Sequence, residues 1–275
     1  TVQLHPLIRE FFGMKRSQMA EDEAMKRSFY LAIIAEADKA GNKPEQSLLK
    51  ETNAVLPHLA EASKQFEAAG NEETLASCLA WLAFLYYFQG RYAEAEPRYA
   101  QALEIYQRQL GGDHPDVARS LNNLAFLYYF QGRYAEAEPR YVQALEIYQR
   151  QLGGDHPDVA SSLNYLAEFY CSQGRYAEAE PRHMQALEIR QCQLGGDHPD
   201  VASSLNSLAR LYYSQGRYAE AEPLYIKALE LSDRVLGVAH STTMTIRQNY
   251  AACLKAMVSA FNAASPMPLS RSLDP

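Results

Sequence analysis

Histidine and aspartate recur together along this 275-residue chain, and the pairing is the first candidate for metal or acid–base chemistry. The histidines stand 42 residues apart at His114, His156, His198 and His240, and the first three follow Asp113, Asp155 and Asp197. A metal site needs several ligands that converge on one point. Each histidine here lies one full period from the next and has a local role at the start of a helix. We therefore expect no metal site and no cofactor.

Carboxylates and thiols give no catalytic constellation either. Glu136 and Glu138 recur with the same period and are expected on a solvated helix face. No His, Ser or Cys is seen to depart from the repeat pattern so as to pair a nucleophile with a base. Cys171 is interpreted as a small apolar filler on a helix. The sequence predicts a protein that is not an enzyme.

A fixed period organises the chain. The octapeptide Gly-Arg-Tyr-Ala-Glu-Ala-Glu-Pro occurs four times, at 90–97, 132–139, 174–181 and 216–223. Units of 42 residues are too small to bury an apolar face alone, so stability must come from stacking neighbours. The period predicts an all-α fold, a right-handed α-solenoid of antiparallel helix pairs.

One unit illustrates the expected helices. His114-Pro-Asp begins a first helix that runs to about Gln131 and buries Leu121, Leu124, Ala125 and Tyr128. Gly132 ends it, and a second helix starts at Arg133 or Tyr134. That helix carries an apolar stripe of alternating small and large residues: Tyr134, Ala137, Tyr141, Ala144 and Tyr148. Because proline disfavours a helix interior, Pro139 predicts a kink or a late start of the second helix.

These motifs resemble the tetratricopeptide repeat in the long form of the kinesin light chain family. Leu121 to Ala125 resembles its L-N-N-L-A signature, Gly132 to Pro139 its G-[RK]-Y-x-E-A-E-P signature, and Leu152 to Ala160 its L-G-x-D-H-P-x-V-A signature. The resemblance covers Thr74 to about Met257. It implies that the first helices line a concave wall, where asparagines grip the backbone of an extended peptide.

The ends of the chain depart from the period. The segment Leu4-His5-Pro6-Leu7-Ile8-Arg9-Glu10-Phe11-Phe12 resembles the L-H-x-L-[IV]-R-x-F end of the winged-helix region of NB-ARC signalling NTPases of the STAND class. This resemblance implies a remnant of a nucleotide-sensing protein. We expect this remnant at 1–14, N-terminal capping helices within 15–73 (15–40 and 45–69), four repeats at 74–239, a capping helix at 240–264 and a disordered tail at 265–275.

Composition excludes several classes of function. A formal net charge of −7 disfavours nucleic acid as a partner, because binding to phosphate backbones requires a basic excess. Four cysteines at irregular intervals without a C-x-x-C pair give no disulfide framework and favour a reducing, cytoplasmic setting. No apolar run is long enough to span a membrane.

The groove residues follow from helical geometry. Steps of about 100° per residue place a second stripe roughly a quarter turn from the buried one. The predicted peptide-binding residues are Asn122, Asn164, Asn206, Phe84, Tyr87, Phe126, Tyr129, Arg210 and Tyr213. The asparagine amides either hold a ligand or hold the neighbouring helix, and the aromatic residues of the first two repeats are either exposed or covered.

The predicted function is a protein–protein interaction module that binds an extended peptide or a partner helix in the groove. The alternative is a sensor or autoinhibitory arm of a STAND-type NTPase whose nucleotide-binding half is absent from this chain. The uniformity of the repeats also leaves self-association as a hypothesis.

Overall fold

A computed structural model describes residues 56–264 of the chain apart from 58, 61, 62 and 65. All of its regular secondary structure within this range is helical. The chain divides into two compact units, the first ending at Gly112 and the second beginning at Asp113. Helices follow one another in packed pairs in both units, which confirms the predicted all-α repeat fold.

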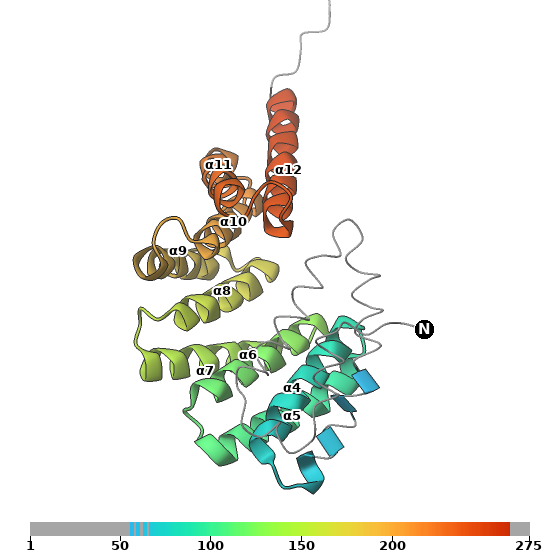
Figure 1. The fold of residues 1–275 in the computed structure, drawn as a ribbon. Coiled ribbons are helices and arrows are strands. Elements are labelled where there is room, and N and C mark those ends of the chain that lie inside the picture. Colours follow the sequence, from blue (N-terminus) through green and yellow to red (C-terminus); the bar gives the residue numbers. More distant parts are fainter. Residues whose placement is uncertain (1–55, 58, 61–62, 65, 265–275) are drawn as a thin grey trace, which may run out of the picture. The chain divides into compact units, whose positions relative to one another are not determined.

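The helices alternate between two types (Figure 1). The A helices are α4 (Glu72–Phe88), α6 (Pro115–Phe130), α8 (Pro157–Ser172) and α10 (Pro199–Ser214). The B helices are α5 (Tyr92–Leu110), α7 (Tyr134–Leu152), α9 (Tyr176–Leu194) and α11 (Tyr218–Val235), and α12 (Ser241–Ala264) follows them. The first unit contains α4 and α5, and the second contains α6 to α12.

Local sequence sets the helix ends as predicted. The Nδ1 atom of His114 accepts a hydrogen bond from the amide of Asp116 at 3.2 Å, so His114 is the N-cap and Pro115 is the first helical residue. After α6, Gly132 adopts a φ of 73°, a left-handed conformation that glycine reaches without strain. The B helix then begins at Tyr134, the later of the two predicted positions.

Proline does not delay the B helices. Helix α7 includes Pro139 as its sixth residue, and the other three B helices contain Pro97, Pro181 and Pro223 at the same place. The late start is therefore wrong, and the kink, the other expectation for Pro139, stays a prediction. In α7 the guanidinium of the following Arg140 donates to the carbonyl oxygen of Glu136 at 2.7 Å. The side chain thus adds a hydrogen bond close to the position where proline removes one.

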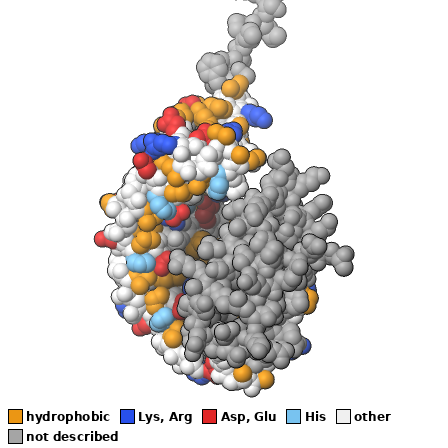
Figure 2. Space-filling view, viewed as in Figure 1, with side chains coloured by type: hydrophobic (Ala, Val, Ile, Leu, Met, Phe, Trp, Pro, Cys, Tyr) orange, Lys and Arg blue, Asp and Glu red, His pale blue; other side chains and the backbone are white. Residues whose placement is uncertain are grey.

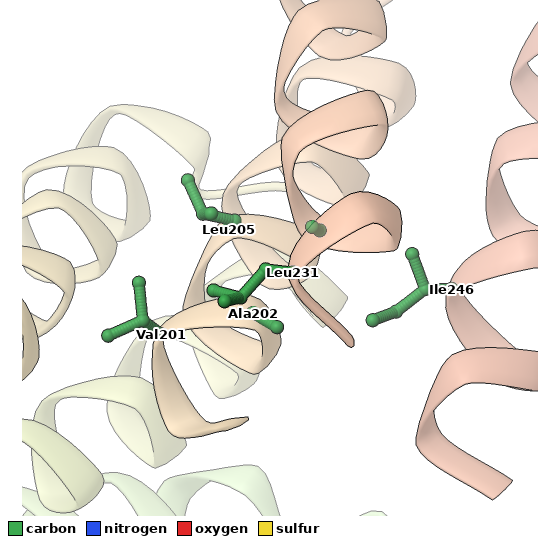
Figure 3. Close-up of a cluster of buried hydrophobic side chains, with 6 residues drawn as sticks. Val201, Ala202, Leu205, Leu231 and Ile246 are labelled. Carbon is green, nitrogen blue, oxygen red and sulfur yellow. The ribbon is translucent and has the colours of Figure 1, made fainter. Parts of the chain in front are cut away.

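Small residues bring the paired helices together. Ala125 on α6 and Ala137 and Ala144 on α7 are fully buried, and the predicted apolar stripes of both helices are buried around them. Tyr134 is the exception, with 41% exposure, because it lies at the very start of its helix. At the other end of the second unit, one cluster joins α10, α11 and α12 (Figure 3); its members are Val201, Ala202, Leu205, Ala228, Leu231 and Ile246.

The predictions for the ends of the chain lie outside the described residues. These are the NB-ARC-like remnant at 1–14, the capping helix at 15–40 and most of that at 45–69, and the tail at 265–275. Helix α12 covers Ser241–Ala264, and its role as a cap stays a prediction.

Candidate peptide-binding groove

Successive A helices lie close together in the second unit. Helix α6 packs against α8, α8 against α10, and α10 against α12, whereas successive B helices do not pack on one another to the same extent within the described chain. In a curved stack, the elements on the inner side are the closer ones. This closer approach of the A helices agrees with the sequence expectation that they form the inner wall, which stays a prediction.

The predicted asparagines lie on this wall but reach across to the next repeat. The Nδ2 atom of Asn122 lies 3.4 Å from Oγ of Ser162, and Nδ2 of Asn164 lies 3.5 Å from Oγ of Ser204. Oδ1 of Asn206 accepts a hydrogen bond from Nδ2 of Asn249 at 3.0 Å. Each amide thus contacts the next repeat. This agrees with the interpretation that the asparagines hold the neighbouring helix.

The three asparagines differ in exposure. Asn122 is only 6% exposed, and its Oδ1 is buried without a hydrogen-bond partner in the described structure. Asn164 and Asn206 are half-buried. A ligand therefore has access to Asn164 and Asn206 but little access to Asn122.

More accessible side chains lie one turn further along each A helix. We call Phe126, Glu168 and Arg210 the groove row; they stand 42 residues apart on α6, α8 and α10. Phe126 is 38% exposed, and Nη1 of Arg210 lies 3.3 Å from Oε1 of Glu168, which places α8 and α10 side by side at this row. Half-buried Tyr129, Cys171 and Tyr213 follow three residues later. The row thus changes from aromatic to acidic to basic.

The first unit carries the same pattern on α4. Phe84 is exposed and Tyr87 is half-buried, at the positions of Phe126 and Tyr129. Phe84 packs edge-on against Phe88 with ring centroids 4.9 Å apart, and Phe126 packs against Phe130 at 4.8 Å. Each unit therefore exposes a pair of phenylalanines.

The tetratricopeptide repeat family matches the chain over residues 74–150, 121–168, 158–231 and 200–266. The chain belongs to the tetratricopeptide repeat family. No curated protein matches it. No described helix of this tetratricopeptide repeat chain is long and apolar enough to cross a membrane.

Solved structures give the same assignment. BtubC (BKLC) from P. vanneervenii superposes with a TM-score of 0.59 at 25% identity, over 82% of this chain and 96% of that one. A Podosopora anserina putative kinesin light chain with nearly identical TPR-like repeats gives 0.59 at 26% identity, over 70% and 91%. A Rap protein complexed with Competence and Sporulation Factor gives 0.58 over 85% and 69%; at 18% identity this shows the fold alone.

One repeat of the tetratricopeptide array replaces a tyrosine pair by a cysteine and a histidine. Cys171 stands where the other repeats have Tyr87, Tyr129 and Tyr213, and His183 stands where they have Tyr99, Tyr141 and Tyr225. Sγ of Cys171 lies 3.8 Å from Nε2 of His183, whose Nδ1 lies 3.0 Å from Oδ1 of Asn164. The expectation that no histidine or cysteine departs from the repeat pattern was therefore wrong; the pair was not predicted because its residues are twelve positions apart on different helices.

Burial keeps the two groups of this pair un-ionised. It raises the pKa of the Cys171 thiol to about 12, with a further contribution from the Glu168 carboxylate. It lowers the pKa of His183 to about 4, assisted by the charges of Arg210 and Arg190. A thiolate is the reactive form of cysteine, and this arrangement disfavours it. The cysteine, histidine and asparagine therefore form a polar contact of the core, and the apolar-filler interpretation of Cys171 was incomplete.

A buried arginine occupies another tyrosine position. Arg190 on α9 replaces Tyr106 and Tyr148 of the first two repeats, and burial lowers its pKa. Its guanidinium donates to Oγ of Ser204 at 2.7 Å and to Oγ of Ser161 at 3.2 Å. Arg190 therefore links α9 to both α8 and α10.

The repeated glutamates have two distinct roles. Glu136 pairs with Arg133 of its own repeat and, as predicted, lies at the solvent surface. Glu138, two residues on, reaches Arg175 of the next repeat at 2.8 Å, and Glu180 likewise reaches Arg217 at 2.8 Å. The expectation of a merely solvated face was wrong for this second glutamate, because it lies on the side of the B helix that meets the next repeat.

This contact between repeats predicts different effects for two neighbouring glutamates. Glu180 accepts hydrogen bonds from Arg217 and from the Tyr212 hydroxyl, whereas Glu178 is bonded to Arg175 of its own repeat. We expect Glu180→Gln to lower the free energy of unfolding by about 1–2 kcal/mol and Glu178→Gln by less than about 0.5 kcal/mol. Urea unfolding followed by circular dichroism measures both, and equal effects would contradict the assignment.

The periodic histidines serve as helix caps. Nδ1 of His156 and His198 accepts the amide of the residue two positions on, as in His114, and His240 does the same. Figure 2 shows histidines spaced along one side of the molecule rather than gathered at one point. The described residues contain no group of three or more side chains able to hold a metal ion.

Proposed function

We propose that the A helices of the second unit bind an extended peptide or a partner helix along the groove row. The observation that carries the proposal is the change of chemistry along one wall, from Phe126 to Glu168 to Arg210, in repeats that are otherwise nearly identical. Buried positions of the stack vary as well, as His183 and Arg190 show, but the groove row lies at the surface, where a ligand with distinct side chains requires such variation.

The family supports this proposal. Tetratricopeptide repeats are generally interaction scaffolds. The exposed rings of Phe126 and Phe130 add an apolar anchor, and aromatic anchors contribute strongly to interfaces. The half-buried amides of Asn164 and Asn206 lie beside the row and offer polar contacts to a ligand backbone.

The test starts from a phage-displayed library of random linear peptides selected on the full chain. We expect selected peptides to lose at least about tenfold in affinity on Arg210→Glu or Phe126→Ser. These variants test the groove better than Asn164→Ala, because Asn164 also holds His183 and its loss perturbs the core.

A matched control separates a local effect at the groove row from a general effect of charge reversal on peptide affinity. Lys227→Glu makes the same charge reversal at an exposed position of the B helix α11. It is expected to leave the affinity of the selected peptides unchanged. Peptides that respond equally to Arg210→Glu and Lys227→Glu, or to neither, would exclude the groove row as the binding site.

A further inference from the structure

Arg190 is a buried cation that forms no ion pair within the described residues. It lies on α9, which packs against both α8 and α10 (Figure 1), and it is only 9% exposed. Its guanidinium donates to Oγ of Ser204, to Oγ of Ser161 and to the carbonyl oxygen of Asp200 at 3.4 Å, which are all uncharged acceptors. A buried charge held only by neutral groups is costly. The surroundings of Arg190 therefore favour the arrival of an anion.

The contact between helices does not itself require a charge at this position. Tyr106 is the counterpart of Arg190 in the first repeat, and its hydroxyl lies 3.0 Å from Oγ of Ser77, the counterpart of Ser161. In the second repeat the position is again a tyrosine, Tyr148. A neutral hydroxyl thus makes the same kind of contact with the A helix. The stacking of the repeats gives no reason for the guanidinium.

The guanidinium of Arg190 also has unused donors. A guanidinium carries five N–H groups. The hydrogen bonds of Arg190 use Nη1 twice and Nη2 once, which leaves Nε–H and one N–H of Nη2. In the described part of the chain, the fully buried side-chain atoms that lack a partner belong to Asn122, Tyr225 and Thr243, so Nε of Arg190 retains contact with solvent. Nε and Nη2 share one edge of the guanidinium, and a carboxylate binds such an edge with both oxygens.

A second departure from the repeat lies near Arg190. Tyr165 on α8 stands where the other A helices have Trp81, Asn123 and Ser207. It is 49% exposed, and its hydroxyl is close enough to act electrostatically on the charge of Arg190. Among the described residues this hydroxyl has no hydrogen-bond partner. One repeat thus brings an accessible hydroxyl donor close to the unused guanidinium donors.

The neighbouring charges indicate which anion fits. Burial lowers the pKa of Arg190, and the carboxylate of Asp200 acts in the opposite direction. That carboxylate lies 3.7 Å from Nδ1 of His198 and does not reach Arg190. A carboxylate ligand carries one negative charge and matches the single charge of the guanidinium. A phosphate carries up to two, and the second would remain unpaired close to Asp200.

We propose that Arg190 and Tyr165 bind the carboxylate of a small acid or of an acidic side chain; we call these two residues the carboxylate site. Nε and Nη2 of Arg190 donate to the two carboxylate oxygens, and the Tyr165 hydroxyl donates to one of them. Ser161, which holds Arg190, lies seven residues before Glu168 on α8, about two helical turns from the groove row. The carboxylate site is therefore separate from the groove row and does not rest on the proposed function.

The experiment titrates the full chain with sodium acetate and follows the NMR chemical shifts of the Arg190 Nε–H and of the Tyr165 backbone amide. We expect both to shift saturably, with half-saturation at about 1–50 mM acetate, and not to respond to sodium chloride at the same ionic strength. Arg190→Tyr, which introduces the residue of the first two repeats, is expected to abolish the response of the Tyr165 amide.

A matched pair of variants tests the hydroxyl. Tyr165→Phe removes one donor to the carboxylate and is expected to raise the half-saturating acetate concentration at least about threefold. Tyr134→Phe is the control, because it makes the same change at an exposed tyrosine on α7. It is expected to leave the half-saturating concentration within about twofold of that of the unmodified chain. Circular dichroism confirms that the variants fold.

A second probe distinguishes the two sources of a carboxylate. Glutamate blocked as an amide at both backbone ends binds as acetate does if the site takes an acidic side chain, whereas binding of acetate alone assigns the site to small acids. The proposal is overturned by the absence of a saturable shift, by equal shifts with acetate and chloride, by equal effects of Tyr165→Phe and Tyr134→Phe, or by tighter binding of inorganic phosphate than of acetate. Arg210→Glu is expected to leave the acetate response unchanged, so the carboxylate site and the groove row can fail independently.

Discussion

Shortening Leu166 to alanine is expected to lower the free energy of unfolding by about 2–5 kcal/mol. Leu166 lies on α8 and is 1% exposed, and α8 packs against helices of three repeats. The surrounding side chains belong to different helices and cannot all move into the space that the leucine leaves. The cost therefore includes a cavity in addition to the lost burial.

The neighbouring residue provides the control for this prediction. Tyr165 is on the same helix but 49% exposed, so Tyr165→Ala removes a larger side chain from the surface. We expect it to change stability by less than about 0.5 kcal/mol. Urea unfolding is followed by circular dichroism, and the midpoints are compared because repeat arrays need not unfold in two states. A Leu166→Ala midpoint equal to that of Tyr165→Ala would contradict the assigned core.

Most of the fold could be predicted from the sequence because the repeats share the same local signals, although α4 has Asn71 as its N-cap in place of a histidine. The capping histidine, the glycine after each A helix and the apolar spacing all act within a few residues, so sequence position determines their effect. The B helices were the exception. Their proline sits in the sixth position, and the helix tolerates it there in all four repeats.

The site could be predicted only in part because its contacts depend on neighbouring repeats. The position of Asn122 on the inner wall follows from helical periodicity, but its burial against Ser162 does not. The same holds for Glu138, whose partner Arg175 lies 37 residues away. Departures from the repeat gave a signal that could have been used: Cys171, His183 and Arg190 all replace tyrosines in one repeat, and all are found in contacts within or between repeats.

One of these departures from the repeat, His183, predicts that the free energy of unfolding depends on pH. The pKa of His183 is lowered to about 4 in the folded chain, chiefly by burial and further by Arg210 and Arg190, whereas an unfolded histidine titrates near 6.5. Between these values the unfolded chain holds a proton that the folded chain does not. Above pH 6.5, His183 therefore does not lower the free energy of unfolding. As the pH falls from 6.5 towards 4, its protonation in the unfolded chain lowers that free energy by about 3 kcal/mol in total.

Replacing His183 by tyrosine, the residue of the other three repeats, is expected to remove this loss. The two chains are compared by urea unfolding at pH 7 and at pH 4.5, and the difference between their pH dependences cancels every group that they share. Cys171 is smaller than the tyrosine found opposite in those repeats and leaves room for the new ring. We expect the unmodified chain to lose stability relative to His183→Tyr on acidification. Parallel losses in the two chains would mean that His183 is protonated as readily in the folded state as in the unfolded one, and that the buried contact with Cys171 and Asn164 does not persist in solution.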